Sequence, residues 1–264
     1  YEGHRVMPYS WAMQTPVSNH EMRMDDATRP RQDPAITVAF RLAPRAGDPG
    51  PIDALVWTTT PWTLPSNLAL AVGPEIDYAI VQVAGRHYVL GAATLKEYEK
   101  ELAGHVVVAT CKGKELVGRT YAPLFPYFAG HANSFRVLGG EFVDTTTGTG
   151  IVHMAPGFGE DDQKVCEANG IQLVCPVDDR GRYTAQVPEW QGTLVFDANK
   201  DIIKVLKDRG VLLRHVTYTH EYPHCWRTRE PLIYKAISGA WFVKVTAIKD
   251  QMLDRKSTRL NSSH

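Results

Sequence analysis

The chain has 264 residues, of which 44% are hydrophobic and 22% charged, an ordinary composition for a globular protein. Lysine plus arginine and aspartate plus glutamate number 29 each, so the net charge provides no overall electrostatic case for nucleic-acid binding. No apolar run approaches the length of a membrane span, and no charged stretch followed by an apolar one marks a signal peptide.

The chain begins at Tyr1 and in the middle of a pattern, so we expect a fragment of a longer protein. None of its four cysteines lies two residues from another, which excludes a C-x-x-C metal or redox pair. We therefore expect reduced thiols, a cytoplasmic location and no metal site.

The N-terminal part predicts a change from irregular structure to strands. Residues 1–34, with four prolines and many charges, predict irregular structure. Ile36–Leu42 alternates apolar and polar residues and predicts a strand, and Asp53–Thr58 predicts another. The glycines and prolines of Arg45–Pro51 predict the loop between them.

The next segment predicts a hairpin followed by a helix. Tyr78–Val83 and Arg86–Gly91 flank a short loop that contains Gly85, which is typical of a β-hairpin. Residues 93–104 place three apolar side chains on one helical face, and Val106–Thr110 predicts a strand. The stretch from Lys112 to Asn133 is rich in loop residues.

The following segment predicts a hairpin and a strand that leads into a helix. Phe135–Val143 is interpreted as the hairpin. Gly148–Asp162 predicts a strand, a Pro-Gly turn and the acidic first turn of a helix that ends before Gly170.

The C-terminal part predicts two strands and two helices. Ile171–Val177 and Val211–His220 predict the strands. Asp197 is the expected N-cap of a helix that reaches Asp208, and residues 241–253 have a helical pattern. Together the elements indicate an α+β fold with a barrel-like, strongly curved mixed β-sheet and peripheral helices.

The stretch "WTTTPWTLPSN", Trp57–Asn67, carries an unusual density of small hydroxyl groups. It contains Thr58, Thr59, Thr60 and Thr63, and it is interrupted by Pro61 and Pro65, which restrict the backbone. The plain structural interpretation is a turn whose hydroxyls bond to their own backbone. The functional one is a neutral polar surface suited to a ribose or an ester, since a phosphate would call for arginine, lysine or a glycine-rich loop.

Two further stretches hold candidate chemical groups. In "GTGIVHMAPGFGEDD", His153 ends a predicted strand and Asp162 opens a helix; they could shape a pocket and bind an ammonium, or be a core histidine and a helix-capping acid. In His220–Glu230, the spacing H-x₃-H-C suggests zinc, but no fourth ligand is near, and we favour an aromatic-rich connector loop.

Four stretches of the chain resemble the editing domain of the isoleucyl-tRNA synthetase family. They are "VWTTTPWTLPSN", "GTGIVHMAPGFGEDD" and the flanks "VMPYSWAMQTPVSNHE" and "YPHCWRTREPLIYKAISGAWFVKV". The first two lie about ninety residues apart, as in that family. Thr60 stands where the valine and leucine enzymes typically have arginine, which favours the isoleucine family.

The resemblance implies a division of the chain. Residues 1–34 would approach from the catalytic domain, 35–217 would form the editing domain, and 218–254 would return. Residues 255–264, "RKSTRLNSSH", interrupt the last helical pattern and are interpreted as a non-native tail.

The resemblance also implies an activity: hydrolysis of valine wrongly esterified to tRNA(Ile). An isoleucine pocket rejects valine by only about 1–3 kcal/mol, and isoleucyl-tRNA synthetase is itself the usual example of that limit. A positioned water, which a hydroxyl of the terminal ribose could assist, would carry out the hydrolysis. The implied partners are the acceptor end of aminoacylated tRNA(Ile) and the rest of the synthetase chain.

By the same resemblance, Thr58, Thr59, Thr60 and Thr63 would contact the terminal adenosine, the ester and the valyl side chain. His153 would exclude isoleucine and Asp162 would bind the α-ammonium. Trp57, Asn67, Gly150 and Asp161 complete the expected substrate-binding set.

The family's catalytic signatures H-I-G-H and K-M-S-K-S are absent, so no cofactor is expected here; ATP and magnesium would belong to the absent catalytic domain. Thr228 stands where relatives often have a second cysteine, which weakens the zinc interpretation. Two alternatives stay open: an editing domain of a valyl or leucyl enzyme, and a non-catalytic module that binds the tRNA acceptor end.

Overall fold

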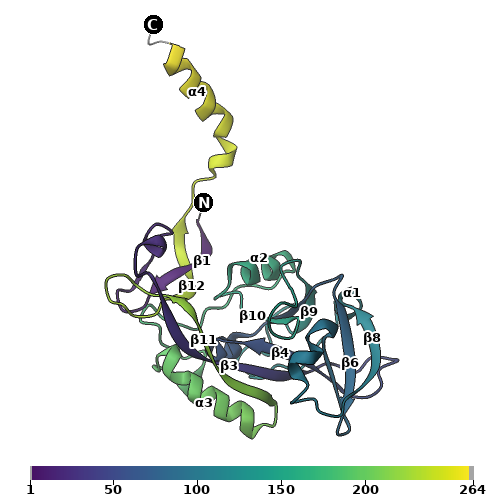
Figure 1. Cartoon of the computed structure of the whole chain (residues 1–264). Helices are drawn as coiled ribbons and strands as arrows, with labels where there is room; N and C mark the ends of the chain where they lie inside the picture. Colours follow the sequence, from purple (N-terminus) through teal and green to yellow (C-terminus); the bar gives the residue numbers. More distant parts are fainter. Residues whose placement is uncertain (1, 262–264) are drawn as a thin grey trace.

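The computed structural model describes residues 2–261, which form strands in three sheets, with helices at their periphery (Figure 1). The strands are β1 (Glu2–Ser10), β2 (Thr15–Pro16), β3 (Thr28–Arg41), β4 (Ile52–Thr58), β5 (Ala69–Val72), β6 (Asp77–Val83), β7 (Arg86–Gly91), β8 (Val106–Lys112), β9 (Arg136–Gly139), β10 (Ile151–Met154), β11 (Leu212–Pro223) and β12 (Ile233–Trp241). The α-helices are α1 (Gly113–Leu116), α2 (Glu160–Ala168), α3 (Val195–Asp208) and α4 (Lys249–Asn261). The 3₁₀ helices are η1 (Glu21–Arg23), η2 (Pro61–Ser66), η3 (Ala92–Tyr98), η4 (Pro188–Trp190) and η5 (Val245–Ala247).

The largest sheet has six strands in the order β11-β3-β4-β7-β6-β8, mostly antiparallel, with β4 and β7 parallel. A three-stranded sheet, β10-β5-β9, lies against it, and β12-β1-β2 forms the third. Within residues 2–261 these sheets do not close on one another, so the α+β class is confirmed but the barrel-like shape is not.

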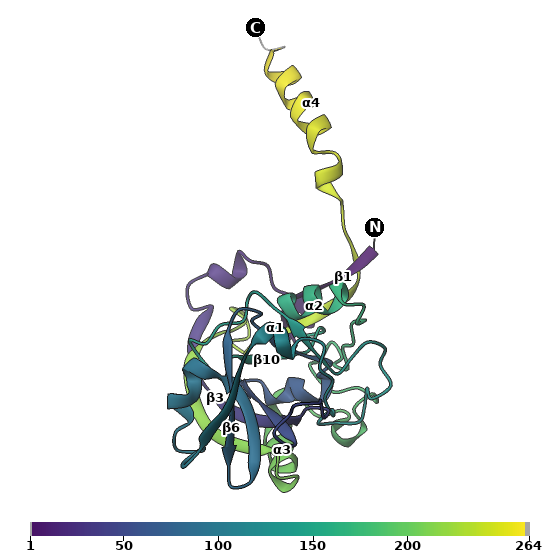
Figure 2. The same ribbon diagram turned by 90° about the vertical axis from the view of Figure 1, so that its right-hand side faces the viewer.

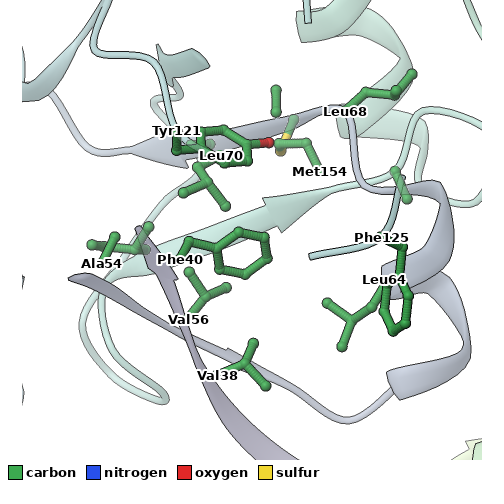
Figure 3. Packing of buried hydrophobic residues seen from close by; sticks show 14 of the residues in the cluster. Val38, Phe40, Ala54, Val56, Leu64, Leu68, Leu70, Tyr121, Phe125 and Met154 are labelled. Carbon is green, nitrogen blue, oxygen red and sulfur yellow. The ribbon is translucent and has the colours of Figure 1, made fainter. Parts of the chain in front are cut away.

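Successive side chains of a strand point to opposite faces of its sheet, and apolar residues occupy both faces of the six-stranded sheet. Val38, Phe40 and Val56 face one way and pack against Leu70 and Met154 of the smaller sheet, as Figure 3 shows. Ala39, Leu55 and Leu90 face the other way, where Tyr98 and Leu102 cover them. The main core therefore lies between the two sheets, directly beneath the threonine-rich segment that follows β4.

The first and last strands of the chain, β1 and β12, meet in the third sheet. β1 pairs antiparallel with β12, from Glu2 opposite Trp241 to Tyr9 opposite Ile233. Beyond β12 the chain leaves the body, and α4 projects away from it in both views (Figures 1 and 2). No helix among the described residues is long and apolar enough to cross a membrane.

Most predicted elements occur in the structure. The strands at residues 36–42 and 53–58, the hairpin of β6 and β7, and the strands β8 and β11 are confirmed. The strand, turn and acidic helix start between Gly148 and Asp162 are also confirmed, and α2 ends before Gly170, whose φ is +71°.

The prediction of irregular structure for residues 1–34 is wrong. β1 fills part of this segment and β3 begins at Thr28. Pro30 and Pro34 are tolerated because residues 28–35 of β3 pair with β11 only, while β4 pairs with residues 36–41. β3 and β11 thus run without a break through the expected domain boundaries at residues 34 and 217.

Two predicted β-elements, the hairpin at residues 135–143 and the strand at residues 171–177, do not form. Residues 135–143 form no hairpin, because β9 pairs in parallel with β5 and the chain then turns. Residues 171–177 form no strand; Ile171 and Val177 are buried, but the segment finds only one isolated bridge, between Val177 and Tyr183.

The helical predictions need smaller corrections. Residues 92–98 form a 3₁₀ helix rather than an α-helix. α3 begins at Val195 after the N-cap Leu194, so Asp197 lies inside the first turn, where its charge still suits the helix dipole. The backbone of α4 continues to Asn261, so the expected interruption at Arg255 is wrong; Ser262–His264 lie outside the described residues.

Candidate functional site

A pocket of about 330 Å³ opens between the threonine-rich segment, strand β10, the loop before it and the start of α2. It is lined by Trp57, Thr58, Thr59, Thr60, Thr63, Phe142, Asp144, Thr147, Gly148, Thr149, Gly150, Ile151, Val152, His153, Ala155, Phe158 and Asp162. Segments separated by some ninety residues thus share one cavity.

The threonine hydroxyls form a connected strip along one wall. Oγ1 of Thr60 lies 3.2 Å from Oγ1 of Thr58 and 3.3 Å from Oγ1 of Thr63. The Thr60 amide donates to the Thr58 hydroxyl at 3.1 Å, and the Thr63 hydroxyl donates to the Thr60 carbonyl at 2.8 Å. The expected local bonds to the backbone therefore exist, and they orient the same hydroxyls toward the pocket.

His153 is buried behind this strip and held at both ring nitrogens. Its Nε2 lies 2.7 Å from the Thr63 hydroxyl and its Nδ1 lies 3.0 Å from the amide nitrogen of Asn67. The Asn67 amide is oriented by Tyr121, which donates to its oxygen at 2.6 Å, and by the Ala69 carbonyl, which accepts from its nitrogen at 2.9 Å.

These contacts determine the protonation of the imidazole. Because the Asn67 nitrogen donates, Nδ1 of His153 must accept, and the ring proton sits on Nε2 and points to Thr63. Burial lowers the pKa of His153 to about 4, so the ring is neutral at pH 7.

Asp162 also lines the pocket, from the first turn of α2. One carboxylate oxygen accepts the Ala155 amide at 2.8 Å, and no cation among the described residues pairs with it. Burial raises the pKa of Asp162 to about 7, and the nearby charge of Asp161 adds to the effect. A carboxylate in this position is costly to ionise alone and gains strongly from an incoming ammonium.

Most of the residues predicted for the site line the pocket. Those that do are Trp57, Thr58, Thr59, Thr60, Thr63, Gly150, His153 and Asp162. Asn67 lies one layer behind, where it orients His153. Asp161 does not line the pocket: it is exposed and lies 3.7 Å from the Lys164 ammonium.

The sequence reasoning missed the loop before β10. Asp144, Thr147 and Thr149 face the pocket from the stretch "DTTTGTG", a second run of hydroxyls whose composition matches the first. Gly148 has a φ of +78°, and a side chain there would meet the Trp57 ring at 3.1 Å. The repeated threonines directly before the motif at Gly148–Asp162 are the sequence feature that could have predicted this part of the pocket.

The zinc interpretation of His220–Glu230 has no support in the geometry. The letters from His220 to His224 also spell H-E-x-x-H, which binds zinc when a helix brings both histidines to one face. Here His220 lies in strand β11 and His224 directly follows the strand, and positions four residues apart on an extended chain are separated by about 13 Å. His220 contacts Asp33 at 2.9 Å instead, and residues 2–261 hold no cluster of three or more His, Cys, Asp or Glu able to bind a metal.

The site thus combines neutral hydroxyls, an uncharged imidazole and the partly buried carboxylate of Asp162, while the second carboxylate of the lining, Asp144, is exposed. A ligand with ester or ribose oxygens and a single positive charge would satisfy all three. A phosphate would meet no arginine or lysine among the pocket-lining residues.

Comparison with known proteins identifies the family. Residues 1–262 match the family model "tRNA synthetases class I (I, L, M and V)", and the chain belongs to that family. It is 51% identical to an isoleucine–tRNA ligase of Rickettsia felis over 271 residues, and 53% identical to one of Mycobacterium tuberculosis over 266 residues. These alignments cover 96% of this chain, which spans about a quarter of the length of either ligase.

Solved structures agree on the fold. The CP1 domain of GlLeuRS superposes with a TM-score of 0.52 at 14% identity and covers 69% of this chain and 98% of that one. The editing domain of the P. knowlesi cytosolic leucyl-tRNA synthetase gives 0.50 at 11% identity, with coverages of 75% and 100%. The chain therefore has the fold of a synthetase editing (CP1) domain.

Proposed function

We propose that this chain hydrolyses the ester of valine wrongly attached to tRNA(Ile), the post-transfer editing reaction of an isoleucine–tRNA ligase. The observation that carries the proposal is the pocket: a hydroxyl wall, a neutral histidine and the partly buried carboxylate of Asp162, which has no cationic partner among the described residues, around one cavity. The 51–53% identity to isoleucine–tRNA ligases supports the choice of substrate.

In this proposal each side of the pocket has its own task. Asp162 binds the α-ammonium of the aminoacyl ester, because a cation relieves the cost of its buried charge. Thr58, Thr59, Thr60 and Thr63 hold the terminal adenosine and the ester. His153 limits the space for the amino-acid side chain, so that valine enters and isoleucine, one methylene larger, does not.

The hydrogen bonds around His153 favour hydrolysis by a positioned water over base catalysis by the ring. The lone pair on Nδ1 is taken by Asn67, and Nε2 carries the proton. Neither nitrogen can therefore accept a proton from water without breaking a bond, and a pKa of about 4 makes the ring a weak base.

We also propose that residues 35–217 are the hydrolytic unit, and that residues 1–34 and 218–254 connect it to the rest of a cytoplasmic synthetase. ATP and magnesium would serve that remaining part, where aminoacylation would occur. The tRNA acceptor end would be the partner of the pocket.

The test is deacylation of Val-tRNA(Ile) and Ile-tRNA(Ile), side by side, by the full 264-residue chain. We expect turnover of the valyl ester and little of the isoleucyl ester. A preference for a threonyl ester or another non-cognate ester would assign the chain to a valyl or leucyl editing class instead. Binding of an acyl-tRNA analogue without hydrolysis of either ester would show that the chain is a non-catalytic module that binds the tRNA acceptor end.

His153→Ala should relax the exclusion of isoleucine, because it enlarges the pocket at the side chain that limits it. We expect deacylation of Ile-tRNA(Ile) to rise about tenfold or more, the value of one methylene in an apolar pocket. His87→Ala is the matched control, since His87 is also buried but lies in β7 and does not line the pocket. Unchanged discrimination in His153→Ala would remove that role.

A further inference from the structure

A second groove, of about 570 Å³, lies beside the pocket, between β1, the η1 turn, β12 and the start of α2. Phe158 lines both cavities and forms the wall between them. Gly159, at the next position, lines the groove while its Cα lies close to the Asp162 carboxylate. The groove therefore begins where the carboxylate side of the pocket ends.

The groove carries uncompensated positive charge. Arg5 and Arg23 line it, both are exposed, and neither forms an ion pair within residues 2–261. The one acid of the lining, Glu160, is already engaged by Lys164 at 3.1 Å. The local field consequently attracts anions, although the chain as a whole is neutral.

Its surface also has flat and polarisable groups. Tyr234 is 39% exposed at the groove, Phe158 forms its inner wall, and Met22 lies with them. Aromatic side chains next to arginines are the usual surface for single-stranded nucleic acid, whose bases stack while phosphates bind the cations.

We propose that this groove binds the single-stranded RNA nucleotides immediately 5′ of the nucleotide that carries the ester. The inference rests on the proposed function, which places the terminal nucleoside in the neighbouring pocket. The groove is larger than that pocket, so it has room for at least one more nucleotide. The pocket, whose lining has no arginine or lysine, takes the nucleoside and ester, and the cationic groove takes the phosphates that lead to them.

Direct binding tests the groove without hydrolysis. A 5′-fluorescein RNA tetranucleotide ending in CCA is titrated with the full chain, by fluorescence anisotropy, at several salt concentrations. The double variant R5Q/R23Q should bind about tenfold more weakly at low salt. For this variant, the slope of the logarithm of the association constant against the logarithm of the salt concentration should become less negative by about 0.7 per arginine lost. Tyr234→Leu should weaken binding and leave that slope unchanged.

The matched control is K100Q/R180Q, which removes two exposed cations that line neither cavity. Equal RNA affinity of R5Q/R23Q and the control would overturn the proposal.

Hydrolysis provides the second measurement. R5Q/R23Q should raise KM for Val-tRNA(Ile) about tenfold and leave the hydrolysis of a valyl ester of adenosine, which lacks the preceding nucleotides, unchanged. An equal loss on both substrates would show that the arginines merely support the pocket and would overturn the proposal. Arginine-dependent RNA binding by a parent chain that hydrolyses neither ester would support the groove and refute the proposed function.

Discussion

At the scale of single residues, the pocket holds two titratable groups whose pKa values are displaced in opposite directions. Burial raises the pKa of Asp162 to about 7 and lowers that of His153 to about 4. Both groups are therefore uncharged between about pH 4 and pH 7 in the empty pocket. A bound ammonium group would lower the pKa of Asp162, because it stabilises the ionised carboxylate, and would leave His153 neutral.

The two shifts affect stability with opposite signs. The folded state retains a proton on Asp162 that the unfolded state releases above pH 3.8, so stability falls as the pH rises from about 4 to 7. The folded state excludes a proton from His153 that the unfolded state binds below pH 6.5, so stability falls as the pH drops toward 4. Over this window the two contributions offset each other.

Asp162→Asn should separate these effects. Asn retains an oxygen acceptor for the Ala155 amide but removes the buried charge, so the variant should be more stable than the parent at pH 8, by up to about 4 kcal/mol, and equally stable near pH 4. Urea unfolding at pH 4, 6 and 8 measures the difference. A difference that does not vary with pH would show that Asp162 is not ionised at a cost.

The same variant should lose editing. Removing a charged acceptor for the α-ammonium should lower kcat/KM for Val-tRNA(Ile) roughly 10- to 150-fold. Normal deacylation by Asp162→Asn, or by Asp162→Ala, would contradict the assigned role. A residue that destabilises the fold and is needed for activity is the pattern expected of a binding group.

At the scale of elements, the turn from β10 to α2 determines where the carboxylate lies. β10 carries His153, Ala155 follows it, and α2 begins after Gly159 with no side-chain cap. The backbone at Gly159 is extended, with φ −133°, a conformation that any residue adopts. Glycine is favoured at this position only because a side chain would have no room. A Cβ there would lie 2.6 Å from Cγ of Asp162.

Gly159→Ala should therefore displace the Asp162 carboxylate without breaking the fold. We expect kcat/KM for Val-tRNA(Ile) to fall about 10- to 100-fold, as for other small misplacements of a binding group. Gly130→Ala is the matched control, because a Cβ at Gly130 meets nothing within 4 Å. Equal activity of the two variants, with equal melting temperatures, would show that the carboxylate adapts to the added methyl group.

At the scale of the whole molecule, the third sheet, β12-β1-β2, is joined by hydrogen bonds to the segment that carries Asp162. The Gln163 side chain, next to Asp162, accepts the Val6 amide at 3.1 Å and donates to the His4 carbonyl at 3.0 Å. On the other side of the turn, the Ala236 amide of β12 donates to the Gly157 carbonyl at 2.7 Å. The expected connectors, residues 1–34 and 218–254, thus hold both ends of the segment that precedes and begins α2.

Gln163→Leu should weaken this attachment. It leaves a buried amide and a carbonyl of β1 without partners, which costs about 1–3 kcal/mol. Urea unfolding measures the loss, and Gln186→Leu, at an exposed position outside the site, is the control. Identical unfolding midpoints for the two variants would show that β1 does not stabilise α2 through Gln163.

The sequence alone was sufficient for the local elements and for half of the pocket. Alternation predicted β4 and the hairpin of β6 and β7, and the acidic turn predicted α2, because these patterns depend on residues a few positions apart. The threonines after β4, His153 and Asp162 could be selected for the same reason, together with the family resemblance.

Only the tertiary structure decided which distant segments meet. In the structure β1 pairs with β12 and β5 pairs with β9. Thr147 and Thr149 line the pocket, whereas Asn67 lies behind His153 and Asp161 is exposed. The tertiary structure also set the pKa values of His153 and Asp162, which depend on burial by residues far along the chain. The physical reason is that propensity and periodicity act over a few residues, whereas strand partners, desolvation and side-chain networks depend on contacts across the whole fold.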